Sequence, residues 1–437
     1  MTQTKRTILK VFIGLVVIVA VVAGVRLWQT LDTSRSNAAN DSVTLSQFKS
    51  DDLEAIKRGQ YVMRLGDCSA CHTSGNGYMA GGYEVKTPFG SLYSSNITPD
   101  PEVGIGNMTE RDFFNAVRQG QGSHGFLYPA MPYTAYVNFT DQDMHDLWAY
   151  FSTVAPVNHD IDETQDMPFP FNVRLSLAGW NMLFFDNEGI EPDPQQSDEW
   201  NRGQYIVDGG GHCSACHGPR NFLGAEISSL YMQGGNLGEW YAPDITSNPH
   251  QGIGDMSKEQ IMSYLKTGTD GIAVASGPMA EAIEHSTQYF TEEDLGAIAT
   301  YLKSIPASEE KAPHPALPVT EKMTLSYEVN CSACHGLEGE GIQGMAPAFT
   351  NNNVIRADDP TNLIHAMLKG VRAAHTETVQ TAAGMPSFAW KMNDQQVADI
   401  LNYVRNSWGN TAIEVTADQV GSMRESLGAR QKLTEAN

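Results

Sequence analysis

The chain contains three identical copies of a five-residue motif whose side chains could bind a cofactor covalently. The motif is Cys-Ser-Ala-Cys-His, at residues 68–72, 213–217 and 331–335. Two cysteines separated by two residues and followed directly by a histidine are typical of c-type haem attachment. The thiols add to the two vinyl groups of one porphyrin, and the histidine then lies where it can bind the iron. We predict three covalent haems c, attached through Cys68, Cys71, Cys213, Cys216, Cys331 and Cys334, with His72, His217 and His335 as iron ligands.

Paired cysteines have three other common uses: disulfides, zinc half-sites and thioredoxin-like redox pairs. A zinc site usually needs two ligand pairs that close on one ion. A redox pair has no use for a histidine fixed beside its second cysteine. The three motifs also account for all six cysteines of the chain. The residues therefore favour covalent haem.

The length of the chain and its internal repetition indicate several domains. A chain of 437 residues is long enough for about three domains of roughly 100 to 150 residues each. We expect cytochrome c domains over residues 50–155, 196–305 and 319–410. The remaining segments are a signal or membrane anchor with its tether over 1–49, linkers over 156–195 and 306–318, and a C-terminal tail over 411–437.

Each predicted domain shows the same order of helix signals around its motif. A lead-in helix precedes the motif, and Arg-Gly-Gln-Tyr occurs in it at 58–61 and again at 202–205. A short amphipathic helix ending at glycine and then a closing helix follow the motif. The amphipathic helices are predicted over 109–117, 257–265 and 359–368, and the closing helices over 140–154, 291–305 and 393–408. This order predicts an all-α fold of three tandem class I-like cytochrome c domains with long loops.

The sixth iron ligand separates electron transfer from haem catalysis, because an open face can bind substrate. Between the amphipathic helix and the closing helix, each repeat has one methionine next to a proline: Met131, Met279 and Met385. Proline stiffens such a loop through its fixed φ angle. Most methionines fill cores, and the chain has 18 of them, so the argument depends on the threefold recurrence. We predict these three as axial ligands. Met279 is the weakest of them because no proline follows it.

Histidines are the rival ligands. His124, His285 and His375 lie near the methionine loops in the sequence and would give bis-histidine haems of lower potential. The competing interpretation is that they are surface residues or hydrogen-bond partners. His212, just before Cys213, is expected to lie near a haem edge.

The N-terminus predicts export and contact with a membrane. Residues 8–25 are almost uninterruptedly apolar, with Lys5 and Arg6 before them and Arg26 behind. By the positive-inside rule the rest of the chain is then translocated, as covalent haem attachment also requires. The run is about long enough to span a bilayer and ends near Trp28, whereas residues 21–23 could serve as a signal cleavage site. We favour a retained anchor, followed by a polar tether over 30–44.

Charge and composition constrain the partners of the chain. The formal net charge of −23 argues against nucleic acid and against a polybasic grip on anionic lipid. The aromatic stretches at 167–172 and 180–185 are unusual for a linker and suggest packing at a domain junction or contact with a partner. The tail has a weak apolar stripe at Val420, Met423 and Leu427, typical of a solvated surface helix or of a docking segment.

Several further stretches carry a resemblance to one family. They include Thr-Pro-Phe-Gly at 87–90, Ser-Asn-Ile-Thr-Pro-Asp at 95–100, Tyr-Pro-Ala-Met-Pro-Tyr at 128–133 and Tyr-Val-Arg-Asn-Ser-Trp-Gly-Asn at 403–410. With residues 66–68, 169–172, 240–243, 277–281 and 331–336, the resemblance covers about 51–416. The chain closely resembles the three-haem cytochrome c subunits of bacterial membrane-bound dehydrogenases, which oxidise alcohols, gluconate, sorbitol or aldehydes at the periplasmic face.

The resemblance implies that Met131, Met279 and Met385 are the sixth ligands. It also implies that electrons arrive from a separate catalytic subunit, a quinoprotein, flavoprotein or molybdoprotein, and leave to ubiquinone. A small third subunit is a further candidate partner. The resemblance implies that many family members are secreted with a cleaved signal and held by their C-terminal part. A retained N-terminal anchor, with the domains on the periplasmic side of the inner membrane, would be a departure.

We therefore expect an electron-transfer subunit with no substrate-oxidising site of its own. The sequence has no nicotinamide fingerprint, no pyridoxal lysine context and no nucleophile elbow. One rival is a peroxidase-like haem enzyme with one open haem, at Met279. The other is a stand-alone multihaem electron shuttle, which the membrane segment and the three-domain length disfavour.

Overall fold

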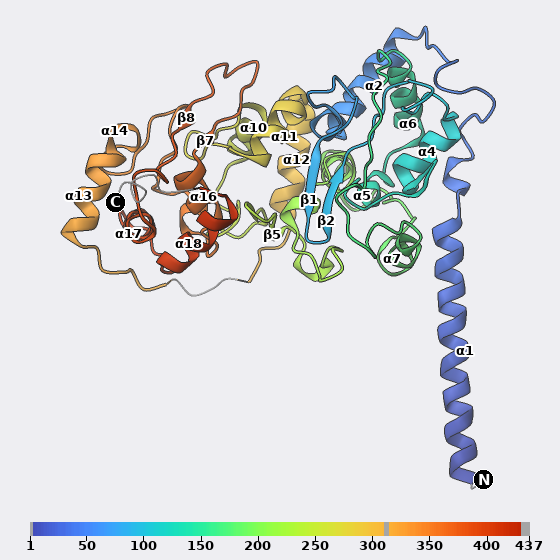
Figure 1. The fold of residues 1–437 in the computed structure, drawn as a ribbon, viewed down its shortest axis with the longest axis horizontal. Coiled ribbons are helices and arrows are strands. Elements are labelled where there is room, and N and C mark those ends of the chain that lie inside the picture. Colours follow the sequence, from blue (N-terminus) through green and yellow to red (C-terminus); the bar gives the residue numbers. More distant parts are fainter. Residues whose placement is uncertain (1–2, 310–313, 430–437) are drawn as a thin grey trace. The chain divides into compact units, whose positions relative to one another are not determined.

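Figure 1 shows the fold of the computed structural model, which describes residues 3–309 and 314–429. The chain forms two compact units: unit 1 is Met1–Glu191 and unit 2 is Pro192–Asn437. Helices predominate in both, and the sheet within the described ranges consists of four separate two-stranded ladders. The prediction of a mainly helical fold is confirmed, whereas the division into three tandem domains stays a prediction.

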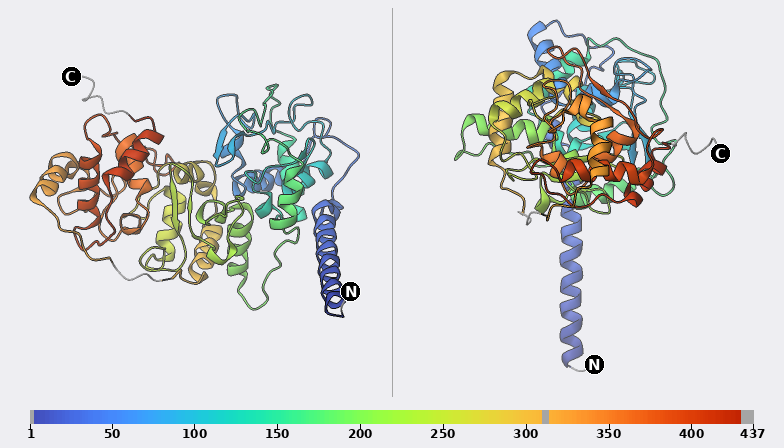
Figure 2. Two further views of the ribbon diagram at one scale, coloured as in Figure 1. Left: turned by 60° about the horizontal axis from the view of Figure 1, so that its bottom comes forward. Right: turned by 90° about the vertical axis from the view of Figure 1, so that its left-hand side faces the viewer.

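Unit 1 begins with the long helix α1 (Gln3–Leu31), which extends away from the rest of the unit for most of its length (Figures 1 and 2). Its other helices are α2 (Leu53–Leu65), α3 (Cys68–His72), α4 (Glu110–Gln119), α5 (Tyr133–Tyr136), α6 (Asp141–Phe151), α7 (Ser176–Phe184) and the short η1 (Ser34–Ser36). Its antiparallel ladders are β1 (Glu84–Thr87) with β2 (Gly90–Tyr93), and β3 (Gln121–Gly122) with β4 (Gly125–Phe126).

Unit 2 carries the second and third motifs. Its N-terminal half contains α8 (Asp198–Tyr205), η2 (Ile206–Gly210), α9 (Ser214–His217), η3 (Ser228–Leu230), β5 (Gln233–Asn236), β6 (Tyr241–Asp244), α10 (Lys258–Thr267), α11 (Pro278–His285), η4 (Thr287–Tyr289) and α12 (Glu292–Ser304). Its C-terminal half contains α13 (Glu321–Asn330), α14 (Ser332–His335), α15 (Asn353–Arg356), α16 (Thr361–Lys369), β7 (Val371–Arg372), β8 (Gly384–Met385), α17 (Asp394–Arg405) and α18 (Ala417–Ser426). The strands pair β5 with β6 and β7 with β8, both antiparallel.

Local signals in the sequence explain where most of these helices begin and end. Thr109 and Ser257 form capping boxes at the starts of α4 and α10. The closing helices α6, α12 and α17 are capped by the side chains of Thr140, Thr291 and Asn393. After the amphipathic helices, Gly120, Gly268 and Gly370 have φ angles of 62°, 84° and 75°, the left-handed region that glycine adopts most readily. These predicted boundaries are confirmed to within a few residues.

The repeated Arg-Gly pair of the lead-in helices makes a close helix crossing. A Cβ atom on Gly59 of α2 would lie 1.8 Å from the carbonyl oxygen of Asp146 on α6. Arg58 donates to both carboxylate oxygens of the buried Asp146, from Nε at 2.7 Å and from Nη2 at 2.8 Å. Glycine therefore permits the approach of the two backbones, and the bidentate charge-assisted pair holds it.

Unit 2 repeats this crossing between α8 and α12. A Cβ atom on Gly203 would lie 2.1 Å from the carbonyl oxygen of Ala297. Arg202 donates to both carboxylate oxygens of Asp294, at 2.7 and 2.9 Å. The third lead-in helix, α13, uses aromatic packing instead, since the fully buried Tyr327 lies with its ring centroid 5.0 Å from that of Tyr403 on α17.

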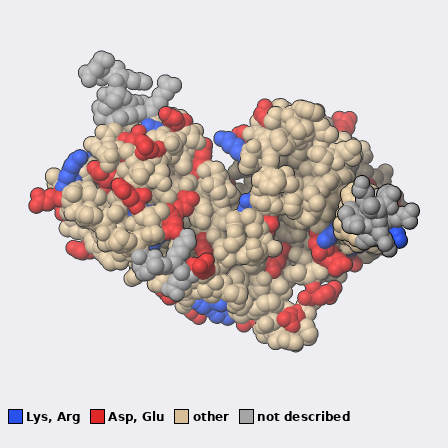
Figure 3. Space-filling view, turned by 90° about the horizontal axis from the view of Figure 1, so that it is seen from below, with Lys and Arg blue, Asp and Glu red and all other residues tan. Residues whose placement is uncertain are grey.

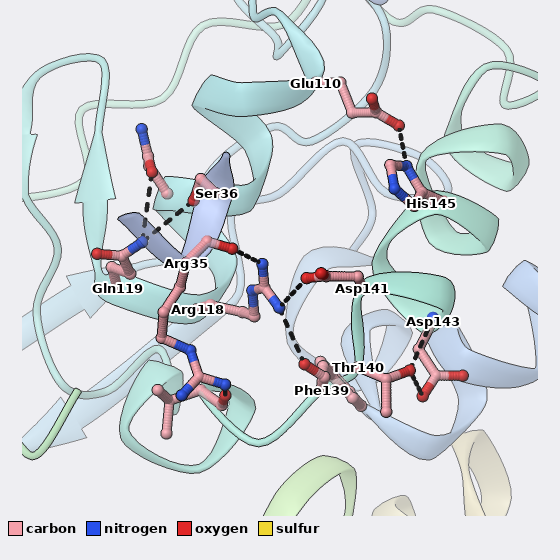
Figure 4. Close-up of polar contacts among 12 residues, drawn as sticks. Arg35, Ser36, Glu110, Arg118, Gln119, Phe139, Thr140, Asp141, Asp143 and His145 are labelled. Atoms are coloured by element: carbon pink, nitrogen blue, oxygen red, sulfur yellow. Dashed lines mark hydrogen bonds and ion pairs between the residues drawn. The ribbon is translucent and has the colours of Figure 1, made fainter. Parts of the chain in front are cut away.

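The predicted tether after α1 packs against other elements of unit 1, since Ser36 within it and Leu45 directly after it are fully buried. Gln119 at the end of α4 donates to the hydroxyl of Ser36 at 3.1 Å. Beside it, the buried Arg118 donates to Asp141 at 2.8 Å, to the carbonyl of Phe139 at 3.2 Å and to the carbonyl of Arg35 (Figure 4). The buried guanidinium therefore connects the segment after α1 to two helices of unit 1.

The described part of the C-terminal tail forms a surface helix whose apolar stripe packs against the rest of unit 2. Its helix α18 packs against α16 and α17, and Val420 and Leu427 of the predicted apolar stripe are buried in the core of that region. Arg424 donates to Asp394 at 2.7 Å and to the carbonyl of Met392 at 2.8 Å. The weak apolar stripe is therefore core, and residues 430–437 lie outside the described residues.

The two predicted linkers differ in structure. The aromatic segment before residue 191 belongs to unit 1, where Phe185 packs edge-on against Tyr133 at 5.3 Å and the Tyr133 hydroxyl donates to Asn181 at 2.7 Å. Part of its aromatic surface thus packs against Tyr133 of α5. Of the link at 306–318, residues 310–313 lie outside the described residues, and the remainder contains no helix or strand, as an extended link requires.

Candidate haem sites

Each cysteine motif has the same local conformation. The motifs fold into the short helices α3, α9 and α14, and each of these ends at the motif histidine. In every copy the first cysteine is partly buried and the second is exposed. The structure thus presents all six predicted attachment thiols in the same pattern.

The three motif histidines share one hydrogen bond that directs their rings. In each, Nδ1 faces a backbone carbonyl oxygen from the segment downstream of the motif. Because a carbonyl can only accept, Nδ1 carries the proton and Nε2 keeps its lone pair, as a metal ligand must. The distances are 2.7 Å from His72 to Ser95, 2.7 Å from His217 to Pro243 and 3.1 Å from His335 to Pro347.

Burial also keeps these rings neutral. Loss of solvent lowers the pKa of His72, His217 and His335, and their hydrogen bonds to the carbonyl oxygens only partly oppose this effect. Neutral imidazole is the form that binds a metal. The three sites therefore fit the proximal side of a haem in tautomer, in charge and in the direction of the ring.

The thiols do not resemble those of a redox pair. Burial raises the pKa of Cys68 and Cys213 to about 12 and that of Cys331 to about 11. A thioredoxin-like cysteine needs a lowered pKa, because the thiolate is the reactive form. No two of the six cysteines form a disulfide, and no three His, Cys, Asp or Glu side chains of the described residues are grouped as for a single metal ion.

The three predicted methionine ligands are all half-buried, but they lie in different types of backbone structure. Met131 lies in a turn closed by a hydrogen bond from its N–H to the carbonyl of Tyr128 at 2.9 Å. Met279 lies in the first turn of α11, and Met385 lies in β8, opposite Val371 of β7. All three follow an amphipathic helix and precede a closing helix.

The position of Met279 differs from the loop that the sequence suggested. Gly277, with a φ of 57°, precedes Pro278 at the first position of α11. Proline suits this position because its missing N–H would have no partner there and its φ is already helical. The proline that precedes this methionine thus starts a helix instead of stiffening a loop.

Two predicted haem residues of the third repeat pack against the same apolar cluster. Cys331 and Met385 both pack against the apolar cluster formed by α16 and α17, which includes Ile364, Leu368 and Leu401. Met131 packs instead with Tyr133, Val137 and Phe185, and Met279 packs with Ala275, Ala280, Ile283 and Ala374.

The rival histidines lie on or near the surface. His124 is exposed in the turn between β3 and β4, and His375 is exposed just after β7. His285 is the last residue of α11 and is half-buried. His212 directs its Nδ1 to the carbonyl oxygen of Gly210 at 2.7 Å, next to Cys213.

A short strand of the third repeat contacts both methionine segments of unit 2, which sequence reasoning missed. Val371 of β7 pairs with Met385, and two residues further on Ala373 forms a β-bridge with Ser276, just before Met279. Between them, Arg372 donates to both carboxylate oxygens of Glu284 on α11, at 2.7 and 3.1 Å. The two predicted ligand segments are therefore joined through three consecutive residues, 371–373.

A second junction lies between the loop before β6 and helix α16. Asn362 pairs with both backbone groups of Tyr241, accepting from the N–H at 2.9 Å and donating to the carbonyl at 2.7 Å. The buried ring of His365 stacks on Trp240 with centroids 4.0 Å apart. The parts of unit 2 that follow the second and third motifs are thus held together by polar and aromatic contacts.

We expect the Glu284–Arg372 pair to stabilise unit 2 in a pH-dependent way. Burial opposes ionisation of Glu284, but hydrogen bonds from Arg372 and from the N–H of His375 prevail and lower its pKa below 4.5. The folded-state pKa therefore lies below the unfolded-state value. The stabilisation is present above about pH 4.5 and is lost as the pH falls through the folded-state pKa.

The measurement is the free energy of unfolding of unit 2 in denaturant, for the wild type and Arg372→Met, from neutral to acidic pH. The difference should be largest near neutrality and shrink in acid. Arg220→Met is the control, because its carboxylate neighbour Glu226 is 3.9 Å away, and its effect should vary much less with pH. A difference for Arg372→Met that stays constant down to acidic pH would contradict the assignment.

A family comparison agrees with the motif geometry. The Cytochrome c family profile matches residues 324–408, which contain the third motif, Met385 and the helices α16 and α17.

Three curated relatives are similar over most of their length. The fructose dehydrogenase cytochrome subunit of Gluconobacter japonicus is 40% identical over 85% of this chain and 82% of its own. The cytochrome c subunit of the quinone-dependent alcohol dehydrogenase of Gluconobacter oxydans is 37% identical over 84% and 82%. The gluconate 2-dehydrogenase cytochrome c subunit of Pantoea cypripedii is 37% identical over 85% and 89%. The chain belongs to the family of cytochrome c subunits of bacterial dehydrogenases.

Proposed function

We propose that the chain carries three covalent haems c and passes electrons from a catalytic dehydrogenase subunit to ubiquinone, at the periplasmic face of the inner membrane. The observation that carries this proposal is the threefold repetition of a histidine that directly follows the second cysteine of each motif and whose Nδ1 donates to a backbone carbonyl. An isolated arrangement of this kind would have several uses. Three copies in one member of a cytochrome c family favour three haems.

The residues of the chain would hold the haems and set their potentials. A bound haem c supplies reversible one-electron chemistry. The six cysteines would attach the three rings, and Nε2 of His72, His217 and His335 would bind the irons. The carbonyl partners at Nδ1 fix each ring and make it a stronger ligand. Sulfur from Met131, Met279 and Met385 as sixth ligand would raise the potentials above those of bis-histidine haems.

The names of the relatives support the proposed electron donor. Their printed names assign them to fructose, alcohol and gluconate dehydrogenases, which favours a catalytic dehydrogenase subunit as electron donor. Substrate would be oxidised there, by a flavin, quinone or molybdenum cofactor, with a small third subunit as a further partner. The exposed apolar helix α1, long enough to cross a bilayer, favours a retained membrane anchor.

Counting haems tests the first part of the proposal. The wild-type chain should contain three haems by pyridine haemochrome and by mass, and the double variant Cys331→Ala/Cys334→Ala should contain two. The single variant Cys71→Ser is a control for folding, because one thioether remains and the count should stay at three while the spectrum of one haem shifts. A wild-type count of two, or an unchanged count in the double variant, would overturn the proposal.

Purification in mild detergent tests the second part. A dehydrogenase subunit should accompany the cytochrome, and its substrate should reduce the haems until a ubiquinone analogue is added. Recovery of a cytochrome with no large partner would instead support a stand-alone shuttle.

A haem enzyme with one open iron is the second candidate, because Met279 differs from the other two methionines in standing on a helix. Three low-spin ferric haems with the weak sulfur-to-iron band would exclude it. A high-spin haem that binds cyanide readily, and that disappears in the variant Cys213→Ala/Cys216→Ala, would support it.

A further inference from the structure

The segment from Pro168 to Phe185 contains no acidic residue. The chain has 51 acidic residues and a net charge of −23, and acidic side chains outnumber basic ones on the face shown in Figure 3. Arg174 is the one charged residue within these 18 positions. It pairs with Glu163, donates to the carbonyl of Phe126 at 3.1 Å and lies over the ring of Tyr128.

The same segment exposes large apolar side chains to solvent. Phe169, Leu175 and Leu183 are 80%, 77% and 69% exposed, and Phe171, Val173 and Phe184 are also exposed. Its other side is held on unit 1, since Leu177, Asn181 and Phe185 are buried. The exposed side chains therefore belong to a segment whose other side packs against unit 1. Monomeric soluble proteins rarely leave apolar side chains grouped in this way unless the surface contacts a partner or a membrane.

Part of this apolar surface lies beside α1, the helix that is long and apolar enough to span a membrane. Helix α7 contacts α1, and Figure 1 shows it next to the end of α1 that joins the body of unit 1. The side-chain amide of Asn187, just after α7, donates to the carbonyl of Asp32 at 3.0 Å, and that of Gln121 donates to the carbonyl of Thr30 at 3.0 Å. The end of α1 is therefore fastened to the same part of unit 1 that bears the apolar segment.

We propose that residues 168–185 insert into the boundary between lipid headgroups and acyl chains, beside α1. This proposal rests on the membrane anchoring by α1 stated above. A spanning helix that ends near Trp28 places its C-terminal end at the membrane surface. Helix α7, which carries the exposed Leu183 and Phe184, contacts α1. Such segments bury their apolar side about 5–10 Å below the headgroups. The lack of acidic residues avoids repulsion from anionic lipid, which the remaining surface of this acidic chain would experience.

The rival occupant is the catalytic subunit. Protein interfaces also use exposed aromatic residues, and the aromatic stretch alone would fit either partner. The position next to α1 favours lipid, because a contact with a dehydrogenase subunit does not need to lie beside the spanning helix. The lack of acidic side chains also favours lipid, because carboxylates are compatible with a protein interface but are repelled by anionic headgroups.

Photo-crosslinking in the full-length holoprotein tests the proposal. p-Benzoylphenylalanine replaces Leu175 or Leu183 in separate proteins, and Leu53 or Phe222 in two controls, which are 69% and 87% exposed but outside the segment. The proteins are illuminated in vesicles of phosphatidylethanolamine and phosphatidylglycerol and in native membranes. At least about tenfold more lipid adduct is expected at 175 and 183 than at the controls, because acyl chains surround a side chain at that depth.

Each outcome decides the question. Adducts at 175 and 183 with the dehydrogenase subunit in native membranes would overturn the proposal in favour of a protein partner. Lipid adducts no more frequent than at Leu53 and Phe222 would overturn it as well. The haem spectrum and the count of haems in the same samples are independent of these adducts, so loss of the electron-transfer function and failure of membrane insertion are distinguishable.

Discussion

Gly59→Ala is expected to destabilise unit 1 by about 3 kcal/mol, at the upper end of the range for overpacking, because the backbone itself must move. The new Cβ would lie 1.8 Å from the carbonyl oxygen of Asp146, a contact that no rotamer can relieve. Separation of α2 from α6 would also lengthen the bonds from Arg58 to Asp146. For a unit of roughly 150–250 residues, 1 kcal/mol shifts the unfolding midpoint by about 2–4 °C, so a fall of about 6–12 °C is expected.

Scanning calorimetry of the holoprotein measures this shift, with the transition of unit 2 as an internal reference. Gly203→Ala is the matched variant, because its Cβ would lie 2.1 Å from the carbonyl oxygen of Ala297, and it should lower the unit 2 transition instead. Gly75→Ala is the control, since a Cβ there would meet no atom within 4 Å. Equal midpoints for Gly59→Ala and Gly75→Ala would refute the helix-crossing argument.

Met131→His is expected to lower the potential of one haem by an amount on the order of 0.1 V, within the ~0.8 V range that axial ligands span. Thioether sulfur favours reduced iron, and imidazole does so less. Met131 is half-buried in a turn and packs beside Tyr133 and Phe185, so a histidine there would occupy the position proposed for the sixth ligand. One third of the sulfur-to-iron band should disappear, while the total haem content stays the same.

Spectroelectrochemical titration resolves the three potentials. Met345→His is the control, because Met345 is 45% exposed and lies outside the three predicted ligand positions, and it should leave all potentials unchanged. No shift in Met131→His would exclude Met131 as a ligand. A shift of all three potentials would contradict independent binding of the first haem in unit 1.

The sequence was a good guide wherever structure depends on neighbours within a few residues. Thr109, Ser257 and Asn393 each bond to the third residue of the helix that they begin, and such caps follow from side-chain chemistry alone. Gly120 and Gly268 end their helices for an equally local reason. The cysteine motifs are also local structures, because each of their short helices lies within the five residues that define the motif.

Long-range contacts could not be predicted in this way. Nothing in the local pattern around Arg372 indicates that it meets Glu284, 88 positions away. The stripe at Val420 and Leu427 is too weak for a strong amphipathic signal, yet it is buried against α16 and α17. The repeated Arg-Gly pair was visible as a repeat, but its role depends on Asp146 and Asp294, which lie 88 and 92 positions further on.

The strand β7 also has a consequence for how this chain could be divided. Ala374, two residues after β7, belongs to the small core around Ala280 and Ile283. Met279, the predicted iron ligand of the second repeat, packs against this core. Transplanting the third repeat into another protein, or deleting it, would uncover that core and leave Glu284 without Arg372. The smallest portable piece of unit 2 is therefore the pair of repeats. In recombination or engineering, the second and third motifs should be exchanged together, whereas the first can be moved with unit 1.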